Sequence, residues 1–325
     1  MLWRWACAVL CSAALSAAGA FPSSAAAAYP DRPIRLVAPF APGGNIDLTA
    51  RTVAPGLSGE LGQSVVVENR GGAGGRIGTE LVAKAPPDGY TLLLGSSGSL
   101  TVNPAFSANV GYDPLRDFTP TSLVSIVPIM LVVHPSLPAR TAREFIALAK
   151  AHPGQIMMAS AGTGSNTHLT GELFQLVTGV KLTHVPYKGS GPALIDLIGG
   201  QTNMIFDQVS TSSPYVKAGK LRAIAVASPQ RSSVLADVPT MAESGVAFEA
   251  LTYTGIFLPS ATSKEIVNRI YAALLKVLDQ QPTRDAFNRL GAEVVKSTPE
   301  EVTRRLRDDL AKWKKVQQRT GIKID

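Results

Sequence analysis

Three short turns combine glycine with proline or with hydroxyl side chains, and each follows an apolar run of strand length. Glycine lets a ligand approach the backbone closely, and N–H groups at the start of a following helix carry partial positive charge. Such groups suit an oxyanion, because each hydrogen bond to a charged group contributes about 1.5–3 kcal/mol. Each turn taken alone also fits a tight turn with a helix cap, but together they predict a site for a small anion. The turns are Pro42-Gly43-Gly44, Ser96-Ser97-Gly98-Ser99 and Ala161-Gly162-Thr163-Gly164-Ser165.

The sequence supports a catalytic site less well than it supports an anion-binding site. No pair among the four histidines has metal-ligand spacing, and no G-x-S-x-G nucleophile elbow occurs. Ser165, His168 and Asp207 remain an alternative as a hydrolase triad, although a histidine in the first turn of a helix also suits a capping or pocket role. We therefore predict a receptor rather than an enzyme, with no catalytic residue, metal or cofactor.

The glycine-rich stretch GGAGGRIG, which begins at Gly71, resembles a nucleotide-binding loop only superficially. Gly72 and Gly74 supply G-x-G, but Ile77 stands where the dinucleotide pattern requires the third glycine. The sequence also has no P-loop. This stretch is predicted to be a flexible connection before a helix.

Strand-length apolar runs alternate with helical patterns along the chain, which predicts an α/β fold with largely parallel sheets. Helices are expected over residues 47–61, 78–85, 142–151 and 168–178, and strands over residues 34–40, 65–68, 91–95, 156–160, 204–207 and 221–227. Thr141, Thr262 and Thr298 each precede a glutamate by three residues, which predicts a capping box at three helix starts.

Two extended segments, PIMLVVHPSLP from Pro128 and FEALTYTGIFLPS from Phe248, are typical of crossings between domains. If both are hinge strands, residues 29–128 and 250–325 form domain 1 and residues 129–249 form domain 2. Ligand sites favour domain interfaces, so the ligand is expected in the cleft between them. The pattern is also compatible with one continuous sheet.

The first 28 residues predict export. They carry a single charge, Arg4, then an apolar run, and they end in Ala26-Ala27-Ala28, which has the small-x-small form of a signal peptidase site. Both cysteines, Cys7 and Cys11, lie in this segment, so the mature chain contains no cysteine. The basic residues behind the net charge of +7 are scattered, which gives nucleic-acid binding little support. We predict a monomeric protein of the periplasm.

Several co-linear segments resemble the Bug-type periplasmic binding proteins, which are the solute receptors of tripartite tricarboxylate transporters. The segments span the mature chain and include YPDRPIRLVAPFAPGGNIDLTAR, VVVENRGGAGGRIGTELVAKAPPDGYTLLLG, YDPLRDFTP, HVPYKGSGPALIDLIGGQTNMIFD, GKLRAIAVAS, RSSVLADVPTMAESG and FEALTYTGIFLP. The resemblance implies a Venus-flytrap receptor of two mixed sheets flanked by helices. It also implies a carboxylate ligand and a membrane permease as partner.

The resemblance also implies which residues form the pocket and that backbone N–H groups hold the carboxylate. Asp47 has two interpretations, a ligand contact or a favourable acid in the first turn of its helix. Tyr253 and Ala247 depart from the tryptophan and glycine common in the family. The implied ligand-binding residues are Phe40, Ala41, Pro42, Gly43, Gly44, Asp47, Ser96, Ser97, Ser99, Ala161, Gly162, Thr163, Gly164, Ser165, His168 and Asp207.

Two questions stay open at this stage. Dicarboxylates, tricarboxylates, acidic amino acids and aromatic acids are all compatible as ligands. The closed receptor could also dock a sensor kinase of a two-component system instead of, or in addition to, a permease.

Overall fold

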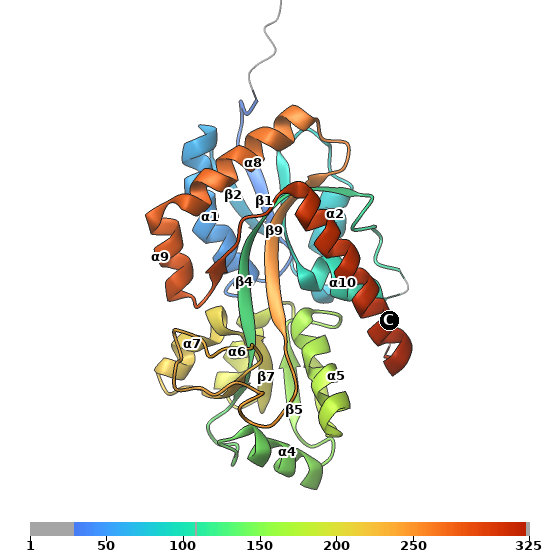
Figure 1. The fold of residues 1–325 in the computed structure, drawn as a ribbon, viewed down its shortest axis with the longest axis vertical. Helices are drawn as coiled ribbons and strands as arrows, with labels where there is room; N and C mark the ends of the chain where they lie inside the picture. The colour runs from blue at the N-terminus through green and yellow to red at the C-terminus, as the bar shows by residue number, and fades with distance from the viewer. Residues whose placement is uncertain (1–28, 108, 323–325) are drawn as a thin grey trace, which may run out of the picture.

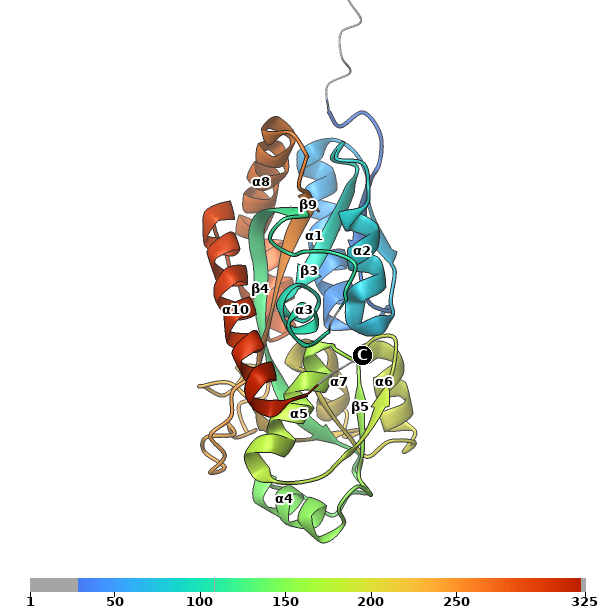
Figure 2. The same cartoon turned by 90° about the vertical axis from the view of Figure 1, so that its right-hand side faces the viewer.

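The computed structural model describes residues 29–107 and 109–322, so the predicted signal peptide lies outside the described residues. Two lobes are stacked along the long axis of the molecule (Figures 1 and 2). The upper lobe contains β1 (Ile34–Ala38), α1 (Asn45–Leu61), β2 (Val65–Asn69), η1 (Ala73–Gly75), α2 (Arg76–Ala83), β3 (Thr91–Ser96), η2 (Gly98–Val102), α3 (Asn103–Phe106), α8 (Lys264–Asp279), α9 (Gln281–Arg289), β10 (Glu293–Val294) and α10 (Pro299–Thr320). The lower lobe contains α4 (Ala142–Ala151), β5 (Met157–Ser160), α5 (Asn166–Thr178), β6 (Thr183–Pro186), α6 (Ser190–Ile198), β7 (Met204–Gln208), α7 (Val209–Lys217) and β8 (Arg222–Val226).

Two long strands, β4 (Phe118–Val133) and β9 (Leu251–Pro259), connect the lobes. β4 pairs with β9 as far as Pro128, and from Ile129 onward it pairs with β7 and β8 instead. The strands therefore form one hydrogen-bonded series, β2-β1-β3-β9-β4-β7-β5-β6, although they serve two lobes.

The sheets are mixed rather than largely parallel. β1 pairs in parallel with β2 and β3, and β5 pairs in parallel with β6 and β7, as crossover helices require. The antiparallel pairs all involve β4 or β9, because the chain leaves the upper lobe along one strand and returns along the other.

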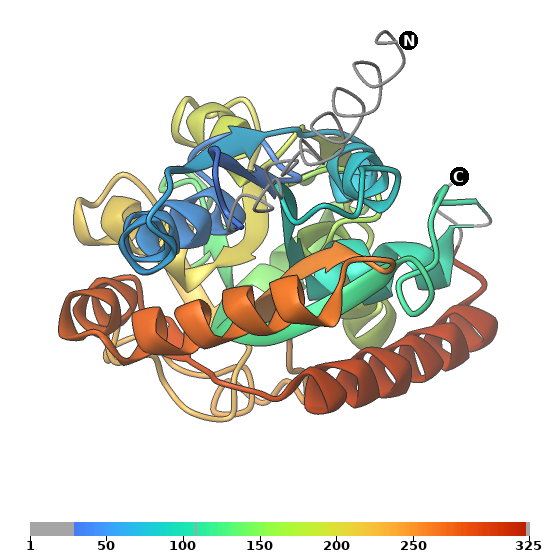
Figure 3. The ribbon, with the colours of Figure 1, turned by 90° about the horizontal axis from the view of Figure 1, so that it is seen from above.

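Side-chain alternation along the strands buries both faces of each sheet. In the upper lobe Leu36 packs in the cluster that contains α1 and α8, whereas Val37 packs in the cluster that contains α2 and α10. Figure 3 shows these helices arranged around the sheet. In the lower lobe Met130 faces the α6 and α7 side, and Leu131 faces α4 and α5. The parallel strands therefore appear in the sequence as continuous apolar runs.

The local signals in the sequence place the starts of α4 and α10 correctly, whereas the helices expected from residues 47, 78 and 168 begin two residues earlier, at Asn45, Arg76 and Asn166. Thr141 and Thr298 cap α4 and α10, and Thr298 forms the complete capping box with Glu301. The expected cap at Thr262 is wrong by one residue: its hydroxyl donates to the carbonyl of Pro259, and Ser263 caps α8 instead. No helix within residues 29–107 and 109–322 has the length and hydropathy needed to cross a membrane.

Candidate functional site

A small, partly open cavity lies where the two lobes meet. Its volume of about 20 Å³ is close to that needed for a single water molecule, so the lobes are closed on each other. A carboxylic acid of several carbons requires the lobes to separate before it can enter. The lining residues are uncharged: Phe40, Gly44, Asn45, Ile46, Ser96, Gly98, Ala161, Ser165, Asn166, Thr167, Ser190, Gln208 and Thr252.

The N-termini of four helices converge on this cavity. Gly44, Ser165 and Gln208 are the N-caps of α1, α5 and α7, and Ser190 is the first residue of α6. The N-caps of α1, α6 and α7 make no side-chain capping bond, so the first N–H groups of these helices have no side-chain acceptor at the cap. Four helix dipoles therefore direct their positive ends toward one small volume.

Asp47 turns away from the cavity. Its carboxylate, which is buried, accepts hydrogen bonds from Gly43 N–H at 3.0 Å, from Arg51 Nε at 2.9 Å and from Asn69 Nδ2 at 3.0 Å. Burial raises the pKa of Asp47, but these hydrogen bonds outweigh burial and hold the pKa below its ordinary value. The carboxylate thus fixes the turn at Gly43, whose φ of +82° favours glycine. Of its two interpretations, Asp47 has the structural one in this conformation, and a ligand contact stays a prediction.

The serine turn after β3 divides its residues between different roles. Ser96 lines the cavity together with Gly98. The Ser96 and Ser99 hydroxyls lie 3.4 Å apart, and each accepts a hydrogen bond from the backbone N–H of the other residue at 3.3 Å. Ser99 therefore stabilises the turn. Ser97 lies toward the other lobe, where its hydroxyl accepts from Asn166 Nδ2 at 3.4 Å.

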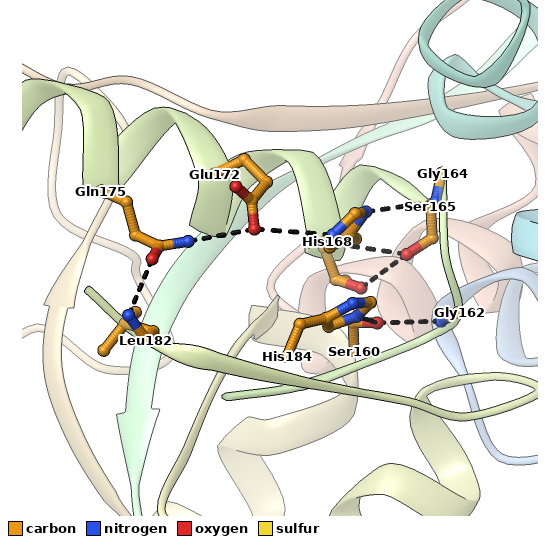
Figure 4. Close-up of polar contacts among 10 residues, drawn as sticks. Ser160, Gly162, Gly164, Ser165, His168, Glu172, Gln175, Leu182 and His184 are labelled. Carbon is orange, nitrogen blue, oxygen red and sulfur yellow. Dashed lines mark hydrogen bonds and ion pairs between the residues drawn. The ribbon is translucent and has the colours of Figure 1, made fainter. Parts of the chain in front are cut away.

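The lower-lobe turn, residues 161–165, uses several of its own backbone donors internally. Gly162 N–H donates to Ser160 Oγ at 3.1 Å and Gly164 N–H donates to His168 Nδ1 at 3.2 Å (Figure 4). Ser165 N–H donates to the carbonyl of Gly162. In this conformation the N–H groups of Gly162, Gly164 and Ser165 already have acceptors within the protein, and their binding of a ligand stays a prediction. Directly after this turn, the first turn of α5 brings Asn166 and Thr167 to the cavity.

His168 and Asp207 lie behind the cavity wall in different networks. The His168 ring is stacked on His184, whereas the buried carboxylate of Asp207 accepts from Ser190 Oγ at 2.6 Å and from Ser212 Oγ at 2.5 Å. Ser165 Oγ accepts from the backbone N–H of His168, not from its ring. These contacts do not form a hydrolase triad. Asp207 instead positions Ser190, which reaches the cavity.

Several lining residues were not anticipated from the sequence. Asn166 Nδ2 donates to Thr252 Oγ1 at 2.8 Å, and Gln208 Nε2 donates to the same oxygen at 3.1 Å, so α5, α7 and hinge strand β9 meet at one point. Asn45 Oδ1 accepts from Ser210 Oγ at 2.7 Å across the lobes, and its buried Nδ2 has no partner. Only Asn45 and Asn166 carried a local signal, because each directly follows the N-cap of a helix.

The stretch predicted as a flexible connection is a tight interlobe contact instead. Gly74 and Gly75 are buried in η1, and a Cβ atom on Gly74 would lie 2.3 Å from the carbonyl oxygen of Thr163 in the other lobe. Ala41 N–H donates across the same interface to the carbonyl of Lys188 at 3.0 Å. Pro42 also meets the lower lobe, because a Cβ on Gly191 would lie 2.1 Å from its carbonyl oxygen. Close backbone approach, rather than flexibility, explains these glycines.

Comparisons with known proteins agree with this architecture. A family model described as the tripartite tricarboxylate transporter family receptor matches residues 49–322. Protein BugT of Bordetella pertussis is 39% identical over 312 residues, covering 95% of this chain and 96% of BugT. The structure of periplasmic binding protein BugD has a TM-score of 0.88 at 36% identity and covers 91% of this chain and 99% of its own. MatC from Rhodopseudomonas palustris, solved with bound malate, has a TM-score of 0.86 at 34% identity, covering 89% and 99% of the two chains. The chain belongs to the receptor family of the tripartite tricarboxylate transporters and has the fold of a two-domain periplasmic binding protein.

Proposed function

We propose that this protein binds a small carboxylate between its two lobes and delivers it to the membrane subunits of a tripartite tricarboxylate-type permease. The observation that carries the proposal is the convergence of four helix N-termini on one uncharged cavity. Partial positive charge from the helices and unpaired N–H groups stabilise an anion without a cationic side chain. The malate in the related structure of MatC supports the same class of ligand.

The cavity favours a carboxylate without an amino group. An ammonium group needs an anionic or strongly accepting partner when it is buried. The nearby carboxylates of Asp47 and Asp207 are both occupied by internal hydrogen bonds and do not line the cavity. We therefore place hydroxy- or unsubstituted carboxylic acids ahead of acidic amino acids.

The test combines identification of the ligand with a matched neutral analogue. Mass spectrometry identifies the compound that co-purifies with the protein, and calorimetry then compares that acid, or malate if none co-purifies, with its amide. We expect the acid to bind at least tenfold more tightly, because the amide lacks the charge that the helix N-termini stabilise. Equal affinity would contradict the proposal, and conversion of the ligand to a product would indicate an enzyme.

Asn45 gives a second test, at the unpaired amide. We expect Asn45→Asp to lower the affinity for the carboxylate at least tenfold, because an anionic oxygen replaces the free Nδ2 donor beside the ligand. Folding should be retained, since an acid in the first turn of α1 is favourable. Calorimetry measures the effect. Asn268→Asp, which adds the same charge on the exposed face of α8, is the control. Equal affinities of the two variants would exclude Asn45 as a ligand contact.

We propose three further properties for the protein in its cellular setting. Cleavage after Ala28 releases a mature chain that begins at Tyr29 in the periplasm. The domain boundary lies in β4, where the strand stops pairing with β9 and begins to pair with β7. Residues 29–128 and 250–325 then form domain 1, and residues 129–249 form domain 2. The mature chain acts as a monomer that closes around its ligand.

A further inference from the structure

A pair of stacked histidines supports the lower-lobe turn from the side opposite the cavity. The rings of His168 on α5 and His184 on β6 lie with centroids 3.8 Å apart and an interplanar angle of 19° (Figure 4). His168 Nδ1 accepts from Gly164 N–H at 3.2 Å. His184 Nε2 lies 2.6 Å from Ser160 Oγ, which in turn accepts from Gly162 N–H. Both glycines have positive φ, +122° at Gly162 and +78° at Gly164, so the histidine pair fixes a turn that few sequences adopt.

The hydrogen bonds define where the protons lie. His168 accepts on Nδ1, so its neutral ring carries the proton on Nε2, which lies 3.5 Å from Glu172 Oε1. Ser160 Oγ accepts from Gly162, which leaves its own hydrogen for His184 Nε2. Each neutral ring therefore presents a lone pair toward the turn, one directly and one through a serine.

Protonation breaks the contact at Gly164 and reverses donor and acceptor between His184 and Ser160. A proton on His168 Nδ1 would set N–H against N–H at Gly164, and a proton on His184 Nε2 would remove the acceptor for the Ser160 hydroxyl. Two positive rings 3.8 Å apart would also repel each other.

The charged group that faces the pair is Glu172 on α5, which also accepts from Gln175 Nε2. The residues contributed by β5 and the turn, Ser160, Gly162 and Gly164, are uncharged. One carboxylate can balance one positive ring but not two. Burial, and next the neighbouring His168, lowers the pKa of His184 to about 4. The ring is therefore neutral near pH 7.

We propose that the stacked pair is a positioning device that holds the lower-lobe turn in its binding conformation only while both rings are neutral, so that ligand affinity falls in acid. This inference rests on the proposed function, because Ser165, Asn166 and Thr167 reach the cavity from the end of that turn. A receptor of this kind would hold its ligand less tightly in an acidic medium.

The decisive experiment needs no ligand. Amide hydrogen exchange, followed by NMR and expressed as protection factors, is measured at Gly162 and Gly164 in the mature protein at pH 7.5 and pH 4.5. We expect protection at Gly164 to fall at least tenfold in acid, while the Gly179 amide, which donates to Gln175 at the end of α5, keeps its protection. Unchanged protection at Gly164 would overturn the proposal.

Variants separate the role of the ring from simple structural support. In His168→Asn the introduced amide oxygen would occupy nearly the place of the ring Nδ1, so this variant should keep Gly164 protected at both pH values. His168→Leu lacks the acceptor and should lose that protection at both. His152→Gln, at an exposed histidine beyond α4, should behave as wild type. Normal protection in His168→Leu, or loss of the pH response in His152→Gln, would also overturn the proposal.

Calorimetry with malate links the turn to binding. Between pH 7.5 and pH 5.0 we expect the wild type to lose at least threefold more affinity than His168→Asn, a comparison in which the titration of malate itself cancels. An equal loss in the two proteins would contradict the link to affinity. Absence of malate binding in both would count against the proposed ligand class, and the protection factors would still decide the role of the histidine pair.

Discussion

Replacing Gly74 by alanine is expected to abolish tight ligand binding while each lobe remains folded. The added Cβ would lie 2.3 Å from Thr163 O and 2.8 Å from Ser165 N, both on the lower-lobe turn. Backbone atoms cannot withdraw as a flexible side chain can, so the lobes would have to stay apart. A ligand that gains contacts from both lobes only on closure should then bind at least tenfold more weakly, which corresponds to about 1.4 kcal/mol. Calorimetry measures the affinity, and small-angle scattering should show no decrease in radius on addition of ligand.

Gly62→Ala is the matched control for this prediction. Gly62 also has positive φ, +73°, but a Cβ there has nothing within 4 Å. Both variants should lose about 1–2 kcal/mol of unfolding free energy, because alanine is strained in the left-handed region. Only the Gly74 variant should lose affinity and closure. Equal affinities would show that this contact does not control closure.

Asp207 should give the largest effect on stability, and the effect should depend on the replacement. Asp207→Ala removes the acceptor for the buried hydroxyls of Ser190 and Ser212, at about 1.5–3 kcal/mol for each bond, so we expect a loss of roughly 3–5 kcal/mol. Asp207→Asn keeps an acceptor and removes a buried charge, so its unfolding free energy at pH 7 should lie within about 1 kcal/mol of wild type. Urea denaturation measures both. Asp207→Ala should also weaken ligand binding, because Ser190 loses the partner that orients it.

The pH dependence of stability supplies the control for Asp207. Burial raises the pKa of Asp207 above its ordinary value, against the effect of its hydrogen bonds. The native state therefore holds this proton more tightly than the unfolded chain, so the contribution of Asp207 is most favourable below pH about 4 and is lost as pH rises through the native pKa. In Asp207→Asn the unfolding free energy should lack this decrease as pH rises, because the amide does not titrate. Asp237→Ala, at an exposed carboxylate, should leave stability within about 0.5 kcal/mol of wild type. A large loss in Asp207→Asn would show that the negative charge itself is required.

Much of the architecture could be predicted from local sequence. Apolar runs and capping residues specify helices and strands through short-range interactions, so α4 has the predicted bounds and Thr298 caps α10 as expected. The glycine turns at Pro42–Gly44 and at residues 161–165 were also identified, because positive φ and the start of a helix leave a signature within a few residues. The family could be recognised from the sequence as well, because its motifs are short segments that occur in the same order along the chain.

The roles of the individual polar groups were decided only by the tertiary structure. Whether Asp47 meets a ligand or Asn69 depends on the packing of β2 against α1, and Gly164 meets His168 only because the turn folds back on its own helix. Asn45, Gln208 and Thr252 come together from segments far apart in the chain, so no local pattern marks them as neighbours. GGAGGRIG has the composition of a flexible linker, yet Gly74 is buried against Thr163 because the lobes close there. Sequence determined which groups are available to bind an anion, and the three-dimensional fold decided which of them still have a free hydrogen-bonding position at the cavity.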